Sequence, residues 1–263
     1  MSNRCQVIFR VDVDTPTASL ILNKVQLKLN YLQYLNNLID LMAEFGIRGT
    51  FMFIPNRTTP PADIVGRILD TGSEIGLHAV EVLPDRLRRE KSEMEEKTGS
   101  QICGLSYHGW DLLDFVLSKL TRKSRYVAYH NPFASLLAGF CYDATGYPYV
   151  RSPLEFLYTS DTRILLFKAC LTITHKRNAA LVLKSYRSLA GWAGFLQDGL
   201  NVFLIHPNHL GRYGFRSAKR EVVRAVFDHV VKHGAEVRTY AEVCSEVCSE
   251  VSSEDALARS RRV

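Results

Sequence analysis

Two aspartates close the first apolar run of the chain, in the stretch VIFRVDVDTP. Asp12 and Asp14 stand two residues apart, and residues i and i+2 of a strand point to the same side. Two neighbouring carboxylates repel one another unless a cation lies beside them. One of them can then bind a metal while the other acts as a general base. The alternative is a pair of strand-end caps or salt-bridge partners, because structural pairs often imitate sites.

Three histidines also end apolar runs: His78 in GSEIGLHAVEV, His108 in GLSYHGW and His206 in VFLIHPNH. Imidazole is the commonest protein ligand for zinc-like metals and a frequent general acid or base. A single histidine at a strand end is more often a hydrogen-bonded structural residue than a ligand. All three histidines end apolar runs, and this shared position indicates a site. Whether they lie close together depends on how the strands that carry them are arranged.

Short β-rich runs alternate with helical stretches along the chain. Helical spacing of apolar residues, with glycine stops, predicts helices at 24–46, 60–71, 85–97, 179–196 and 217–234. Runs rich in Val, Ile and Phe predict strands at 6–13, 47–55, 73–79, 101–108, 163–169, 171–175 and 201–207, and the stretch 236–244 predicts a last strand that turns into a helix. Such alternation favours a parallel sheet covered by helices, and a chain of 263 residues is long enough for a closed or nearly closed (β/α) barrel.

In a barrel of this kind the carboxyl ends of the strands share one face, and active sites form there. Asp12, Asp14, His78, His108 and His206 all follow or end predicted strands. Five ionisable groups at the same end of different strands are hard to explain as core filling. The sequence therefore predicts a hydrolytic site assisted by a metal at one mouth of the barrel.

The amino-acid composition limits the kinds of substrate and partner that we expect. Lys and Arg number 33 against 27 Asp and Glu, so the net charge of +6 suits an anionic substrate, and no basic stripe interleaved with aromatics indicates nucleic acid. The first residues lack the apolar core of a signal peptide, and no apolar run reaches the length of a membrane span. We therefore expect a cytoplasmic protein without stable membrane insertion, whose six cysteines are reduced thiols.

The domain prediction is one barrel domain over residues 1–243, followed by a low-complexity tail over 244–263. The tail begins within a short repeat, EVCSEVCSEVSSE. Its two cysteines could pair on a helix face, but two ligands make a poor metal site, so a helical or fraying tail is the simpler interpretation.

Four motifs in order, FRVDVDT, GTFMFIP, EIGLHA and FLIHP, resemble those of the polysaccharide deacetylase family, the NodB-homology group of metal-dependent carbohydrate amide hydrolases. The resemblance spans about residues 6–240, and its DVD and GLHA forms are similar to a divergent branch that includes deformylases of lipid-linked aminoarabinose. It implies a distorted (β/α) barrel of about seven strands. It also implies a divalent metal cofactor, in the first place zinc.

Residue by residue, the resemblance implies that Asp12 is the catalytic base, Asp14 and His78 are metal ligands, and His206 is the general acid. The second metal histidine of the family, four residues after the first, is here Val82. The arginine motif that follows strand four in the family is also absent. Because catalytic zinc usually takes three protein ligands, a replacement is needed.

His108 is the preferred third ligand, since it ends the neighbouring predicted strand. Glu81, three residues after His78, is the second candidate, and a site without a tightly bound metal is the third possibility. Three further residues are predicted to contact substrate: Tyr107, Trp110 and Asp143. Aromatic residues there could instead belong to the core or a lid.

The function expected from the resemblance is removal of an N-acetyl or N-formyl group from an amino sugar, carried on a glycan, a lipid or a nucleotide. A metal-free amide hydrolase or a sugar-binding relative without activity is the alternative. A metal phosphoesterase ranks lower, because no second cluster of metal ligands is evident in the sequence.

Overall fold

The computed structural model describes residues 5–14, 30–108, 131–146, 152–158, 162–167, 171–172, 196, 198–210 and 218–260. Within these residues the strands are β1 (Gln6–Val13), β2 (Thr50–Phe53), β3 (Glu74–Ala79), β4 (Gly104–Tyr107), β5 (Tyr142–Asp143), β6 (Leu154–Tyr158), β7 (Arg163–Phe167), β8 (Leu171–Thr172), β9 (Leu200–Ile205) and β10 (Glu236–Arg238). The helices are α2 (Asn30–Glu44), α3 (Ala62–Asp70), α4 (Pro84–Thr98), α6 (Pro132–Leu137), α9 (Ala218–Lys232) and α10 (Tyr240–Ser260), with a 3-10 turn η1 (Pro207–Leu210).

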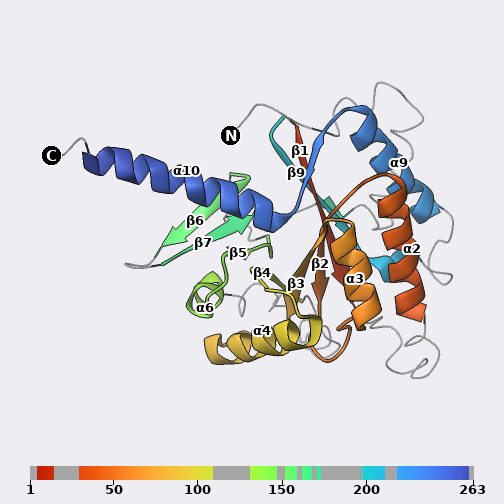
Figure 1. Ribbon diagram of the computed structural model, residues 1–263, viewed down its shortest axis with the longest axis horizontal. Coiled ribbons are helices and arrows are strands. Elements are labelled where there is room, and N and C mark those ends of the chain that lie inside the picture. The colour runs from red at the N-terminus through yellow and green to blue at the C-terminus, as the bar shows by residue number, and fades with distance from the viewer. Residues whose placement is uncertain are drawn as a thin grey trace, which may run out of the picture.

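All ten strands join one sheet, in the order β6-β7-β5-β4-β3-β2-β1-β9-β8, with β10 added beside β1. The pairings are parallel except between β6 and β7, which run antiparallel. Among the described residues β6 and β8 end the sheet without pairing to each other, so the barrel is partial. The predicted distorted (β/α) barrel is thus confirmed as a class of fold, with Figure 1 showing helices around the sheet.

The ten strands exceed the number of about seven that the family resemblance implies, and β5 and β6 match none of the strand ranges predicted from the sequence. β5 contains only two residues. A pair of residues carries no recognisable period, so only its partners in the sheet make it a strand. The predicted helix at 179–196 lies outside the described residues apart from its last position, as does the predicted strand at 171–175 beyond its second residue.

Alternation along β1 divides its side chains between two environments. Val7, Phe9 and Val11 belong to the main core, which lies between the sheet and helices α2, α3, α4, α6 and α9. Ile8 instead belongs to a second cluster on the opposite, inner face of the sheet. The inner positions that follow Ile8 are Arg10, Asp12 and Asp14. The inner face therefore changes from apolar to ionisable toward the carboxyl end of β1.

Helix α10 closes the apolar end of this inner face. Tyr240, at its start, stacks on Tyr142 of β5 with ring centroids 5.2 Å apart and meets Phe167 of β7 edge to face at 4.5 Å. The helix then runs outward past β6 and β7 (Figure 1). The predicted domain boundary between residues 243 and 244 falls inside this single helix, and Cys244 is buried. The division into domain and tail stays a prediction.

No helix among the described residues is both long and apolar enough to cross a membrane.

Candidate active site

Asp12 is held by the arginine that precedes it by two positions on β1. Arg10 donates from Nε to Asp12 Oδ1 at 2.7 Å and from Nη2 to Oδ2 at 2.6 Å, and both side chains are buried. A further hydrogen bond from Arg10 Nη1 reaches the carbonyl of Ala144, just after β5. Burial alone raises the pKa of Asp12, but Arg10 and His78 outweigh it and hold this pKa below its usual value. Asp12 is therefore an oriented carboxylate, ionised at neutral pH.

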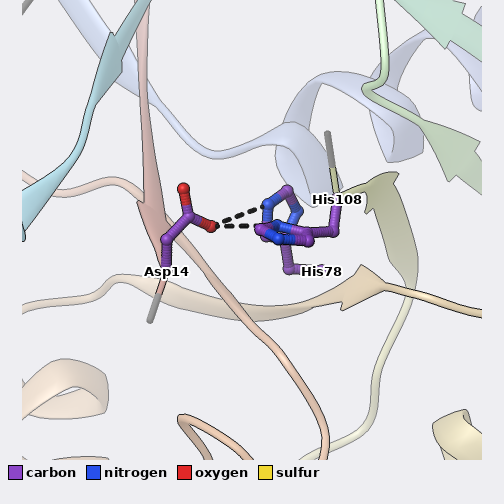
Figure 2. Close-up of side chains that lie close together, drawn as sticks. All are labelled: Asp14, His78 and His108. Carbon is purple, nitrogen blue, oxygen red and sulfur yellow. Dashed lines mark ion pairs between the residues drawn. The ribbon is translucent and has the colours of Figure 1, made fainter. Parts of the chain in front are cut away.

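Asp14 lies at the meeting point of three histidines. Its Oδ1 is 3.0 Å from His78 Nε2 and 3.3 Å from His108 Nδ1, while its Oδ2 is 3.4 Å from His206 Nε2. Figure 2 shows the first two rings converging on one carboxylate oxygen. Burial raises the pKa of Asp14, but the adjacent imidazoles of His108 and His78 lower it well below its usual value. This carboxylate is thus the negative centre of a histidine cluster.

His78 is oriented by a neighbour on the adjacent strand. The register of β3 and β4 pairs His78 with Ser106, and His78 Nδ1 lies 2.8 Å from Ser106 Oγ. That hydrogen bond leaves Nε2 facing Asp14, and Nε2 is also 3.8 Å from Asp12 Oδ2. Burial lowers the pKa of His78, but Asp12 and Asp14 outweigh burial and raise it.

His206 approaches the same carboxylate from β9. β9 lies beside β1 in parallel register, and His206 follows its last residue, where Pro207 begins η1. Burial lowers the pKa of His206 and outweighs the attraction of Asp12 and Asp14. His206 Nε2 lies near Asp14 Oδ2, whereas the other two histidines lie near Oδ1.

Three groups fit a metal ion. The ligand atoms of Asp14, His78 and His108 lie within 4.8 Å of one another, the only such group of three or more among the described residues. Two atoms bound about 2.0–2.1 Å from a tetrahedral zinc stand about 3.3 Å apart, close to the separations of 3.0 and 3.3 Å measured from Asp14 Oδ1. Asp14 Oδ1 and His108 Nδ1 are buried without a well-oriented hydrogen bond. A cation would satisfy both atoms.

Glu81, the other candidate for third ligand, lies outside this cluster. Its carboxylate pairs with Arg86 at 3.2 Å, and both side chains are more than one-third exposed. Val82, at the position of the family's second histidine, packs against the main core. The structure brings His108 to Asp14 and His78, and it places neither Glu81 nor Val82 in the group of ligand atoms.

Tyr107 and Asp143 occupy the helix-facing side of the sheet, away from the inner face that carries the histidines. Both are buried, and Ser135 of α6 connects them: its Oγ donates to Asp143 Oδ2 at 2.8 Å and lies 3.1 Å from the Tyr107 hydroxyl. Asp143 also accepts from the amide of Thr145. These contacts suit a structural network, and the substrate contacts predicted for both stay untested. Trp110 lies outside the described residues.

Arg10 and Ser106 are the site residues that the sequence interpretation missed. Each stands two positions before a recognised residue, Arg10 before Asp12 and Ser106 before His108. The same period of two that placed the aspartates on one face also applies to them. A charged residue inside an otherwise apolar strand was the available signal for Arg10.

No family model and no curated protein matches the sequence. Solved structures do match. A candidate polysaccharide deacetylase from Mycobacterium smegmatis superposes with a TM-score of 0.63 at 18% identity, over 95% of this chain and 92% of the other. PuuE allantoinase gives 0.60 at 12% identity, over 93% and 90%. A CE4 family pseudoenzyme from Bacillus anthracis gives 0.50 at 10% identity, over 93% and 66%.

The fold is therefore that of the polysaccharide deacetylases, as the order of the sequence motifs indicated. At identities of 10–18% these likenesses establish the architecture.

Proposed function

We propose that this protein is a metal-dependent hydrolase that removes an N-acyl group, acetyl or formyl, from an amino sugar. The observation that carries the proposal is the convergence of Asp14, His78 and His108, with the Arg10–Asp12 pair beside them and His206 on the other side of Asp14. These six groups lie on or just after β1, β3, β4 and β9, and each lies within hydrogen-bonding or ion-pair distance of at least one other.

Asp14, His78 and His108 would hold the divalent metal, in the first place zinc, since one carboxylate and two imidazoles form a usual set of catalytic zinc ligands. When bound, the ion supplies Lewis acidity toward the amide carbonyl and lowers the pKa of an attacking water. Ser106 contributes by fixing the ring of His78 through Nδ1.

Asp12 is the proposed general base. Its Oδ2 is the oxygen nearer the cluster, 3.8 Å from His78 Nε2, and can receive the proton of a water that attacks the substrate carbonyl. Arg10 holds both oxygens of Asp12, which limits rotation of the carboxylate. Because its pair with Arg10 keeps the pKa low, Asp12 is ready to accept that proton at neutral pH.

His206 is the proposed general acid. It faces the cluster from β9, with Nε2 3.4 Å from Asp14 Oδ2. Burial lowers its pKa, so the ring is a stronger acid once protonated, although a smaller fraction of it is protonated at neutral pH. Delivery of that proton to the leaving nitrogen turns a poor amide anion into a neutral amine. The products are acetate or formate and the free amino sugar.

An N-acylated amino sugar is the substrate class that fits the deacetylase description of the M. smegmatis structure. The net charge of +6 is compatible with a sugar attached to a phosphate, as in lipid- or nucleotide-linked precursors. We extend the proposal to such precursors and to a cytoplasmic location.

A metal-free or non-catalytic protein of the same fold is the alternative. Val82, at the position of the family's second histidine, and the likeness to a CE4 pseudoenzyme support it. Metal content and turnover together distinguish the two.

The test combines elemental analysis of protein purified without chelators with release of acetate or formate from N-acetylated and N-formylated amino sugars. Wild type should carry about one metal per chain, and His108→Ala should lose it together with turnover. Glu81→Ala, which removes an exposed ion pair, is the matched control and should keep both. Absence of metal from wild type after reconstitution with zinc would exclude the proposal.

A further inference from the structure

Four of the six cysteines gather at the opposite end of the sheet from the histidine cluster. Cys103 precedes β4, whose other end leads to His108, and Cys141 precedes β5. The Cys141 amide donates to the Cys103 carbonyl at 2.7 Å, and the Cys244 thiol lies 3.5 Å from the Cys141 carbonyl. Cys248 follows one turn later on α10, with its sulfur 4.0 Å from that of Cys244.

Cys103 and Cys141 are direct neighbours across two parallel strands. β4 and β5 pair Gly104 with Tyr142, so the residue before each occupies the next matching position. Adjacent strands lie about 4.8 Å apart, and disulfides join residues whose Cα atoms are about 4.4–6.8 Å apart. The backbone thus already holds the two residues at a separation that a disulfide can span.

The two thiols differ in accessibility and acidity. Cys141 is exposed, whereas Cys103 is partly buried. A hydrogen bond from the Cys103 thiol lowers the pKa of Cys141 to about 6, burial opposes this, and Lys91 adds to the lowering. Lys91 is anchored nearby, with Nζ 3.0 Å from the Gly139 carbonyl and 5.1 Å from the centre of the Phe140 ring. The same contact raises the pKa of Cys103.

We propose that Cys141 and Cys103 form a thiol–disulfide exchange site for low-molecular-weight disulfides of the glutathione class. An accessible thiolate beside a second cysteine is the arrangement of reversible redox sites. Cys141 thiolate attacks one sulfur of the disulfide, forms a mixed disulfide and releases one small thiolate. Cys103, on losing its proton, then attacks the Cys141 sulfur and releases the second small thiolate. The net reaction oxidises two protein thiols to one disulfide and reduces one small disulfide to two thiols.

The pair on α10 is a poorer candidate for the same chemistry. Cys244 is buried, and burial together with Cys248 raises its pKa. A metal site made by the four cysteines is not supported either, because among the described residues the only group with ligand spacing is that of Asp14, His78 and His108.

The experiment treats the reduced full-length protein with excess oxidised glutathione near pH 7. After acid quenching, the remaining thiols are alkylated and every cysteine is assigned by peptide mapping. Wild type should yield a Cys103–Cys141 disulfide. Cys103→Ser should stop at a mixed disulfide of glutathione on Cys141, and Cys141→Ser should leave Cys103 reduced.

A second measurement compares rates of alkylation by iodoacetamide at pH 6, using Cys5 as the internal reference. About half of Cys141 is thiolate at that pH, against less than about one part in a thousand for Cys5, whose pKa is raised above 9.0. After allowance for the weaker nucleophilicity of an acidic thiolate, Cys141 should react about twenty-fold faster. Equal rates would overturn the assignment.

Three mapping results would also overturn the proposal. They are a mixed disulfide that persists on Cys141 in wild type, a reactive Cys103 in Cys141→Ser, and a disulfide that forms between Cys244 and Cys248 in place of the proposed one. None of these readouts depends on amide hydrolysis, so the proposed function and this site succeed or fail separately.

Discussion

Arg10 and Asp12 form a two-fold hydrogen-bonded ion pair on one face of a single strand, with donor–acceptor distances of 2.7 and 2.6 Å. Bidentate pairing of this kind fixes the plane of a carboxylate as well as its charge. Arg10 also reaches the Ala144 carbonyl after β5. The candidate base is therefore oriented from its own strand, and its orienting residue is tied to the far side of the site.

The first prediction concerns this pair. Arg10→Lys keeps the positive charge but loses the planar fork, so kcat should fall about ten- to a hundred-fold through misplacement of Asp12. Asp12→Asn should lower kcat by about 10²–10⁴-fold, the usual contribution of a general base. Both variants should retain metal, because Asp14, His78 and His108 are intact. Normal turnover in Asp12→Asn would show that Asp12 is not the general base.

The second prediction concerns the support of His78. Ser106→Ala deletes the partner of Nδ1, so metal affinity measured by chelator competition should fall about ten- to a hundred-fold. Ser135→Ala is the matched control, since Ser135 is equally buried but bonds to Asp143 and Tyr107 on the helix-facing side. Equal losses of metal affinity in both variants would mean that Ser106 acts only through general stability.

The third prediction concerns the buried carboxyl of Glu74 at the start of β3. Burial raises its pKa from 4.5 to about 7, although Tyr142, the Ala241 amide and Thr50 donate hydrogen bonds to it. The folded state thus binds this proton more tightly than the unfolded state. Its contribution to stability is complete below about pH 4.5 and is lost as the pH rises through about 7.

Glu74→Gln replaces the protonated acid by an uncharged analogue and should remove this loss. Between pH 5 and 8, the free energy of unfolding of wild type should fall by about 2–3 kcal/mol more than that of the variant. Urea unfolding at both pH values measures the difference. Glu90, whose burial raises its pKa to about 7, titrates in both proteins and cancels from the comparison. Parallel curves for the two proteins would contradict the prediction.

The fourth prediction separates packing from substrate binding at Tyr107 and Asp143. Tyr107→Phe removes one hydrogen bond to Ser135 and should lower the free energy of unfolding by about 1 kcal/mol, with KM unchanged. Asp143→Asn should cost about 1–3 kcal/mol, because Ser135 and the Thr145 amide both donate to its carboxylate. A ten-fold rise in KM at unchanged stability would instead support the substrate contacts predicted from sequence.

Much of the architecture was readable from local patterns. The apolar run before Asp12 and Asp14, and the similar runs before His78, His108 and His206, indicated parallel strands whose polar groups collect at one end. Such patterns are reliable because side-chain direction alternates along every strand and burial selects the residues of each face. The fold class and the set of candidate residues follow from them.

Tertiary structure decided which of these residues lie together. The choice between His108 and Glu81 depends on the register of β3 with β4, which places Ser106 beside His78 and His108 two residues further along. The partner of Arg10 across the barrel depends on where β5 ends. Neither the register of β3 with β4 nor the contact of Arg10 with the Ala144 carbonyl can be predicted from a periodic pattern in the sequence.

Tertiary structure also decided where the side chains of Tyr107 and Asp143 lie. Their residue types suit substrate binding, but the alternation of β4 and β5 turns both toward α6, where Ser135 bonds to them. Cys103 and Cys141, thirty-eight positions apart in the chain, likewise become neighbours only through the pairing of those two strands. The sequence by itself determined the local alternation and the strand ends. Sheet order and register, which depend on contacts between distant segments, determined the site.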